Sequence, residues 1–211
     1  MKQLLVLFLF FLISCRAQDQ PLQYAKEIQG EDLRSLLYVY ASDYFEGRRT
    51  GTVGQRRATD FLRHFYQSHQ IEAAKGTDDY YQNMKLPVDG TKVETQNVVA
   101  IIPGEQLPNE YIILSSHLDH LGMRNGEIFN GADDDGSGTV ALLEIAAAFQ
   151  KAKKEGNGPK RSIIFLHVTG EEERLLGSKY YTNNPLYPLA QTVANLNVDM
   201  IGRVDPKRDN P

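Results

Sequence analysis

Side chains that could hold a metal ion recur along this chain in three separated groups. They are His117 and Asp119, the aspartates at 133–135, and a later set made of Glu171, Glu172 and Asp199. An imidazole and several carboxylates supply the nitrogen and oxygen donors that divalent cations of the zinc class accept. The sequence therefore predicts a metal site, provided that the fold brings these distant residues together.

Strands and helices that could position these groups are predicted from the apolar pattern. Apolar runs of strand length occupy 97–102, 111–116, 162–169 and 193–198, and His117, Glu171 and Asp199 follow the last three of them. Helical spacing of apolar residues predicts a helix over 138–154, which ends in lysines. The first two strands are expected to be neighbours, and strands alternating with helices predict a mixed, largely parallel α/β sheet flanked by helices.

Convergence at one edge of that sheet gives each residue a chemical role. The carboxyl ends of parallel strands meet at one edge, so His117, Asp134, Glu172 and Asp199 are predicted ligands for one or two cations. A bridging carboxylate would hold two metals about 3.5–4 Å apart. Asp119 could accept the other ring N–H of His117 and fix its tautomer. Glu171 would then be free to act as general base for water attacking a carbonyl.

Ordinary structural explanations exist for each group taken alone. The aspartates at 133–135 could cap the helix that follows, the glutamates at 171–173 could be a solvated charge run, and Asp199 could be a turn residue. These separate explanations do not account for the predicted placement of all three groups at one edge of the sheet. Metal chemistry is therefore the preferred interpretation.

The first fifteen residues have the pattern of an export signal. An apolar run from Leu4 to Ile13 is too short to span a membrane, which takes about 20 residues. The segment from Leu12 to Cys15 resembles a bacterial lipoprotein cleavage box. We expect a signal peptide at 1–14, a lipid anchor on Cys15 and a tether over 15–30, with the domain from 31 to 211 in the cell envelope. An ordinary secretory signal with an incidental cysteine is the alternative.

Charge excludes one class of partner. The formal net charge of the 211 residues is -4, and no long basic stripe is present. Nucleic-acid-binding proteins carry basic patches that neutralise phosphates. Binding of nucleic acid is therefore not expected.

Four motifs occur in order along the second half of the chain. They are Ser116-His117-Leu118-Asp119, the glycine-rich run 131–138, Gly170-Glu171-Glu172 with 175–178, and Asn197-Val198-Asp199-Met200. In these motifs the chain resembles the M28 family of zinc-dependent aminopeptidases, over about residues 31–205. The resemblance implies two zinc ions bridged by Asp134, with His117 and Asp199 on one metal and Glu172 on the other. It also implies Glu171 as general base and Asp119 as the residue that orients His117.

Two departures from the family pattern stand out. Arg174 occupies a position where the family usually has glycine. The family's second metal also takes a histidine from a later loop, and no histidine follows Asp199. His167 lies within a strand, about 13 Å from Glu171 at roughly 3.3 Å per residue, and a packing or substrate-side role is expected for His120. We therefore expect the sequence to stop within the domain, with its second metal site lacking a histidine.

Together these features predict an exported zinc exopeptidase that removes single residues from peptide N-termini. One alternative is a different zinc amidohydrolase on the same fold, such as a carboxypeptidase. Another is a weak or inactive fragment that acts as a binding module. Glu171 argues against a binding module, because a pure binder has no use for an unliganded base beside metals.

Overall fold

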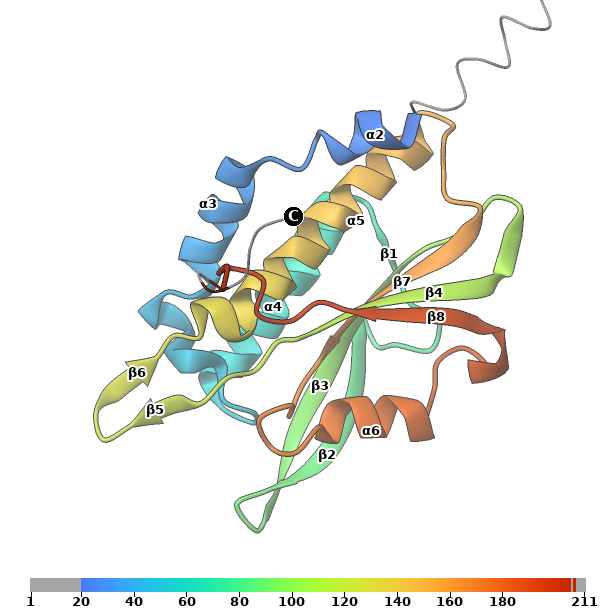
Figure 1. Ribbon diagram of the computed structural model, residues 1–211. Coiled ribbons are helices and arrows are strands. Elements are labelled where there is room, and N and C mark those ends of the chain that lie inside the picture. The colour runs from blue at the N-terminus through green and yellow to red at the C-terminus, as the bar shows by residue number, and fades with distance from the viewer. Residues whose placement is uncertain (1–19, 206, 208–211) are drawn as a thin grey trace, which may run out of the picture.

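A mixed sheet of six strands forms the centre of the molecule (Figure 1). The computed structural model describes residues 20–205 and residue 207. The strands are β1 (Glu72–Ala73), β2 (Tyr81–Val88), β3 (Thr91–Ile102), β4 (Leu107–His117), β7 (Arg161–Val168) and β8 (Thr192–Asn197). A two-stranded hairpin of β5 (Gly122–Arg124) and β6 (Glu127–Phe129) projects from the sheet. The predicted α/β fold with a mixed sheet and flanking helices is confirmed.

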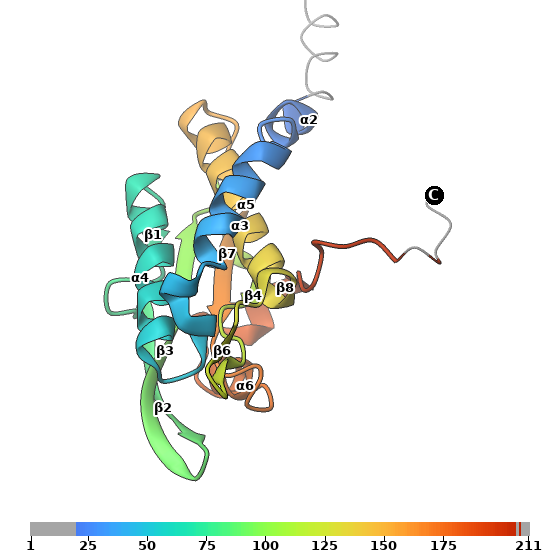
Figure 2. The ribbon, with the colours of Figure 1, turned by 90° about the vertical axis from the view of Figure 1, so that its left-hand side faces the viewer.

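Helices cover both faces of the sheet. They are α2 (Gln20–Ala25), α3 (Gly30–Tyr40), α4 (Val53–Ser68), α5 (Gly138–Lys154) and α6 (Leu176–Asn183). In Figures 1 and 2, α3, α4 and α5 lie on one face and α6 lies on the other. Alternate side chains of β7 point to opposite faces of the sheet. Phe165 belongs to the same buried cluster as Leu142 of α5, and Ile164 belongs to the same cluster as Tyr181 of α6. Burial on both faces explains the nearly continuous apolar sequence of β7.

The order of the strands corrects one prediction. The spatial order is β1-β3-β7-β4-β8, with β2 also paired to β3. β3 and β4 follow one another in sequence and are predicted neighbours, but that prediction is wrong because β7 lies between them. Parallel pairing is confined to β7, β4 and β8, whereas β1, β2 and β3 pair antiparallel.

The segment expected to be a tether is partly helical. α2 begins at Gln20, inside the range 15–30, and packs against α5. The Tyr24 hydroxyl donates a 2.7 Å hydrogen bond to Glu155, just after α5. The part of this segment that forms α2 is therefore packed onto the helical layer through Tyr24. The predicted export signal and Cys15 lie outside the described residues, within which no helix is long and apolar enough to cross a membrane.

His167, on β7, is a buried histidine with a structural role. Its Nε2 lies 2.6 Å from the Tyr66 hydroxyl and its Nδ1 lies 3.0 Å from the Ser116 hydroxyl. Burial lowers the pKa of His167 to about 3. Its ring therefore stays neutral in the folded protein at pH values where an unfolded chain would protonate it.

His167 should make the folded protein sensitive to mild acid. Between its unfolded pKa near 6.5 and its folded pKa of about 3, only the unfolded state binds the proton. The free energy of unfolding should therefore fall by about 1.4 kcal/mol per pH unit from this residue as the pH drops through that range. Urea denaturation of wild type and His167→Gln between pH 7 and pH 4 measures the difference. A wild-type slope matching that of His167→Gln would contradict the assignment, and the exposed His64→Gln serves as control.

Candidate metal centre

Three parallel strands deliver the predicted ligands to one edge of the sheet. His117 is the last residue of β4, Glu171 and Glu172 follow β7, and Asp199 follows β8. Asp134 comes from the turn Ala132–Ser137 that leads into α5. Because β7, β4 and β8 are parallel, their carboxyl ends meet at this edge. Four segments distant in sequence therefore contribute to one cluster.

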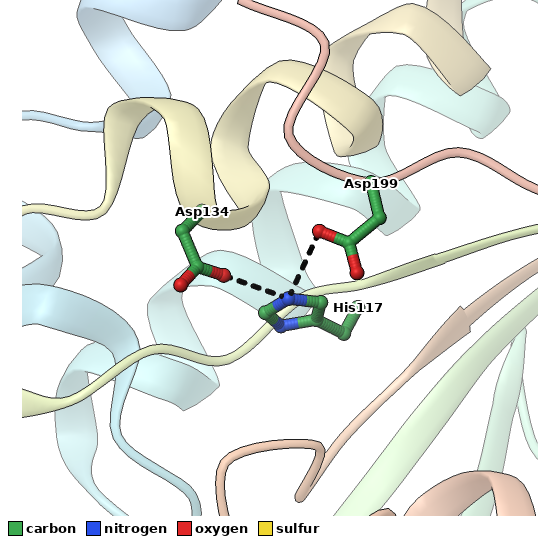
Figure 3. Close-up of side chains that lie close together, drawn as sticks. All are labelled: His117, Asp134 and Asp199. Atoms are coloured by element: carbon green, nitrogen blue, oxygen red, sulfur yellow. Dashed lines mark ion pairs between the residues drawn. The ribbon is translucent and has the colours of Figure 1, made fainter.

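The first donor group consists of His117, Asp134 and Asp199 (Figure 3). The Nε2 atom of His117 lies 3.0 Å from Asp134 Oδ1 and 3.8 Å from Asp199 Oδ1. The other ring nitrogen, Nδ1, lies 3.0 Å from the backbone carbonyl oxygen of Asp119. A carbonyl only accepts, so Nδ1 carries the proton and the lone pair of Nε2 faces the two carboxylates. This is the tautomer that a metal ligand requires.

The second donor group consists of His120, Asp134 and Glu172. His120 Nδ1 lies 2.8 Å from Glu172 Oε1 and 4.0 Å from Asp134 Oδ2. Asp134 therefore directs one oxygen to each group, which is the arrangement of a bridging carboxylate. His120 was not among the ligands predicted from sequence, although its position three residues beyond His117 places it at the same strand end.

The contact that orients His117 comes from the backbone of Asp119 and not from its carboxylate. Its carboxylate lies 3.9 Å from His117 Nδ1, and the backbone carbonyl of Asp119 makes the orienting contact instead. The carboxylate accepts hydrogen bonds from the backbone N–H of Glu171 at 3.1 Å and from the Thr50 hydroxyl at 3.0 Å. Burial raises the pKa of Asp119, and His117 and these donors oppose that rise. Asp119 thereby ties the loop that carries Glu171 to the end of β4.

Asp135, beside Asp134, connects three segments of the site through hydrogen bonds to its buried carboxylate. Its carboxylate accepts from the backbone N–H groups of His117 at 3.2 Å, Gly138 at 2.9 Å and Met200 at 3.3 Å. It is fully buried, and burial raises its pKa to about 7. Asp133 likewise accepts from the backbone N–H of Gly202 at 2.8 Å. These two aspartates hold the loops together, while Asp134 between them points into the cluster.

Arg48 is a buried cation behind the cluster. Its guanidinium donates to the carbonyl oxygens of Leu118 at 3.1 Å, Asn130 at 2.6 Å and Gly131 at 2.8 Å. A fourth bond, of 3.2 Å, reaches the carbonyl of Tyr40, whose ring also stacks beneath the guanidinium. Arg48 therefore connects the segment after β4 with the loop before Asp134. Nothing next to Arg48 in sequence indicates these contacts, which come from distant segments.

The turn after Glu172 keeps a backbone shape that usually favours glycine. Arg174 has φ of 71° and Leu175 has φ of 62°, both in the left-handed region. A non-glycine residue there costs of order 1 kcal/mol. The departure noted at Arg174 therefore places a residue with a strained backbone in the turn. Leu176 and Gly177 still donate their backbone N–H groups to Gly170 and Thr169.

The donor set fits divalent cations of the zinc class. Each group offers one imidazole nitrogen and two carboxylates, the mixture that zinc accepts. Burial opposes the charged form of His117, yet the carboxylates around it outweigh burial and raise its pKa, which shows the negative potential at the site. Two buried atoms of the second group, His120 Nδ1 and Glu172 Oε1, have no hydrogen-bond partner among the described residues. A bound cation would satisfy both.

A pocket of about 420 Å³ opens beside the first group. His117, Glu171 and Asp199 line one end of it, and the remaining wall comes from β4, β7, α6 and β8. Apolar side chains such as Val168 and Leu175 share this wall with polar ones such as Asn197. The site therefore combines metal donors and an unliganded carboxylate with room for a ligand.

Known proteins resemble this chain in sequence and in fold. The sequence model of peptidase family M28 matches residues 97–210. Leupeptin-inactivating enzyme 1 of Streptomyces exfoliatus is 40% identical over 173 residues, covering 82% of this chain and 35% of that protein. A probable leucine aminopeptidase of Arthroderma otae is 28% identical over 181 residues, covering 81% of this chain and 48% of its own length. This chain thus spans less than half the length of these two curated relatives.

A solved structure supports the same fold. The crystal structure of a Zn-dependent exopeptidase from Parabacteroides distasonis has a TM-score of 0.66 to this chain at 22% sequence identity. The match covers 82% of this chain and 62% of that one.

Proposed function

Because this chain belongs to peptidase family M28, we propose that it acts as a zinc-dependent exopeptidase that removes residues from peptide N-termini. His117, Asp134 and Asp199 would hold one zinc ion, and Asp134 with Glu172 would hold another. The observation that carries the proposal is Asp134, which turns separate oxygens toward two donor groups beside a pocket. When bound, zinc would lower the pKa of a water molecule and polarise the scissile carbonyl.

Glu171 is the proposed general base. Its side chain lines the pocket with His117 and Asp199, and among the described residues it forms no ion pair. Its carboxylate would take a proton from the attacking water as the new carbon–oxygen bond forms. The same carboxyl group would then donate that proton to the leaving nitrogen as the carbon–nitrogen bond breaks. The hydrogen bond from the Glu171 N–H to Asp119 fixes the backbone from which this side chain extends.

The charge of the pocket supports action at the N-terminus rather than the C-terminus. Among the described residues that line it, none is lysine or arginine, whereas Glu171 and Asp199 are both acidic. A substrate's terminal carboxylate would meet no cationic partner there, and carboxylate recognition in proteins relies on such partners. A free α-ammonium group would instead face opposite charge.

Hydrolysis of matched substrates tests this proposal. With zinc present, the protein should release the chromophore from a panel of aminoacyl-4-nitroanilides and should not act on their N-acetylated forms. Incubation with 1,10-phenanthroline should abolish the reaction, and added zinc should restore it. Equal cleavage of the acetylated forms, or release of C-terminal residues from N-blocked peptides, would reject N-terminal specificity. Full turnover after metal removal would reject the zinc mechanism.

A further inference from the structure

We propose that Thr50 is a positioning residue, which fixes the backbone that carries Glu171 by bonding to both Gly170 and the carboxylate of Asp119. The inference rests on the proposed function, because Glu171 is the general base only in that function. Thr50 lies in the turn before α4, far in sequence from both partners. It belongs to neither donor group and does not line the pocket, so it would act only through these other residues.

A single hydroxyl group makes both contacts. The backbone N–H of Gly170 donates to Thr50 Oγ1 at 3.1 Å, and Thr50 Oγ1 donates to Asp119 Oδ2 at 3.0 Å. A hydroxyl has one proton and two lone pairs, and an ionised carboxylate only accepts, so both bonds fit one orientation of the hydroxyl. The other oxygen, Asp119 Oδ1, accepts from the N–H of Glu171 at 3.1 Å. Thr50 and Asp119 together therefore hold two successive N–H groups, the second of which belongs to Glu171 itself.

The residue before Gly170 is held in the same manner. The N–H of Thr169 donates to Asn97 Oδ1, on β3, at 2.9 Å. Residues 169–171 thus give their N–H groups to side chains from three separate segments of the chain. Gly170 has φ of 64°, in the left-handed region, where the chain turns away from β7. Bonds on both sides of this turn fix the direction in which the chain leaves the strand.

The turn that carries Thr50 is itself fixed. Thr50 is only 3% exposed. The next residue, Gly51, donates its N–H to Gln55 Oε1 on α4 at 2.6 Å, and Gln55 Nε2 donates to the Thr95 hydroxyl on β3 at 2.7 Å. Gly51 also packs so closely on Val93 that an added Cβ would lie 2.8 Å from that side chain. A residue that positions a reacting group must be locked by its own surroundings, and Thr50 meets that condition.

A purely structural role for the hydroxyl is the alternative, because buried N–H groups and carboxylates need partners wherever they occur in a protein. The two roles differ in what a substitution changes. Lost stability alone lowers the number of folded molecules but leaves the turnover of each one normal. A displaced general base lowers the turnover of every folded molecule, and a displacement of about 1 Å can cost about 100-fold.

Steady-state kinetics of the zinc-loaded protein test the inference. Thr50→Val keeps the shape of the side chain and removes the hydroxyl, so kcat should fall about 10–100-fold while KM stays within about threefold and bound zinc is unchanged. Thr50→Ser keeps the hydroxyl and should recover kcat to within about threefold of wild type. If Thr50→Val does not fold, Thr50→Ala provides the comparison.

Thr59→Val is the matched control. Thr59 is fully buried in α4, where its hydroxyl donates to the Arg56 carbonyl at 2.9 Å and accepts from Gln96 at 2.8 Å. The substitution therefore removes the same two kinds of bond, and neither partner belongs to the site. Its kcat should stay within about twofold of wild type.

Hydrogen exchange of backbone amides, measured by NMR on the metal-free protein, gives a result that does not depend on turnover. The N–H groups of Gly170 and Glu171 should exchange at least about 10-fold faster in Thr50→Val than in wild type or Thr59→Val. Near-wild-type kcat in Thr50→Val, or a Thr50→Ser variant as slow as Thr50→Val, would overturn the inference. A wild type that cleaves no aminoacyl-4-nitroanilide would overturn the proposed function, and unchanged exchange at Gly170 and Glu171 would then overturn the assignment of Thr50 separately.

Discussion

Replacing Glu171 by glutamine is expected to lower kcat about 10²–10⁴-fold while leaving the metal content unchanged. Glutamine keeps the size of the side chain but cannot accept the proton of the attacking water. Glu171 lines the pocket beside His117 and Asp199 without belonging to either donor group. Steady-state hydrolysis of aminoacyl-4-nitroanilides measures kcat, and elemental analysis of the same samples measures bound zinc.

Glu173 provides the control for this substitution. Its carboxylate pairs with Arg49 at 3.2 Å, is not among the residues that line the pocket, and lies only two positions from Glu171. Glu173→Gln should therefore keep kcat within about threefold, since an ion pair of this kind contributes little. A Glu171→Gln variant with near-wild-type kcat would remove Glu171 from the mechanism. Loss of zinc in that variant would show that Glu171 binds metal instead.

Replacing Arg48 by methionine should cost the folded protein about 3–5 kcal/mol of unfolding free energy. Methionine fills similar volume, but four carbonyl oxygens would lose the hydrogen bonds that the guanidinium donates. Those of Leu118 and Gly131 would keep one other donor each, the Tyr40 hydroxyl and the Gly136 N–H. The carboxylates of Asp119 and Asp135 would also lose their attraction to the buried guanidinium. Urea denaturation in the presence of a chelator measures the loss without a contribution from metal binding.

An exposed arginine provides the control, because its replacement shows how much stability is lost when any arginine is changed to methionine. Arg56 is exposed on α4 and donates one 3.2 Å bond to the carbonyl of Gly51. Arg56→Met should change the free energy of unfolding by less than about 0.5 kcal/mol. The free energy of unfolding of Arg48→Lys should lie between those of Arg48→Met and wild type. An ammonium group has three donors but cannot reproduce the planar fork of a guanidinium. A cost below about 1 kcal/mol for Arg48→Met would show that water replaces the guanidinium.

Features with a local cause could be predicted from the sequence. α5 occupies 138–154 as predicted, since its apolar spacing and its terminal lysines lie within one segment. The positions of His117, Glu171 and Asp199 just after strands are local as well. The hairpin of β2 and β3 also had a local signal, because Asp89-Gly90 connects the two strands and this pair favours tight turns. The strand pattern of β2 itself is weak, because several of its residues are polar.

Features that depend on distant contacts could not be predicted in this way. Nothing near Arg48 in sequence shows that the loops at 118 and 130–131 enclose it. The direction of the His120 side chain depends on a non-repetitive segment and on its packing against Gly131. The place of β7 between β3 and β4 is set by pairings between residues more than forty positions apart in sequence. The apolar pattern of a strand does not indicate which distant strand will pair with it.

That central place of β7 bears on how the chain reaches its folded state. β3 and β4 run antiparallel and only residues 103–106 separate them, the arrangement of an ordinary hairpin. During synthesis both strands emerge before β7, so a direct β3–β4 hairpin is a competing, low-contact-order structure. Such a hairpin would be a kinetic trap, because β7 can take its place only after the pairing opens. Pro108, inside β4, has no backbone N–H and weakens the ladder of that hairpin. In the folded protein residues 105–107 bond instead to residues 159–160, just before β7.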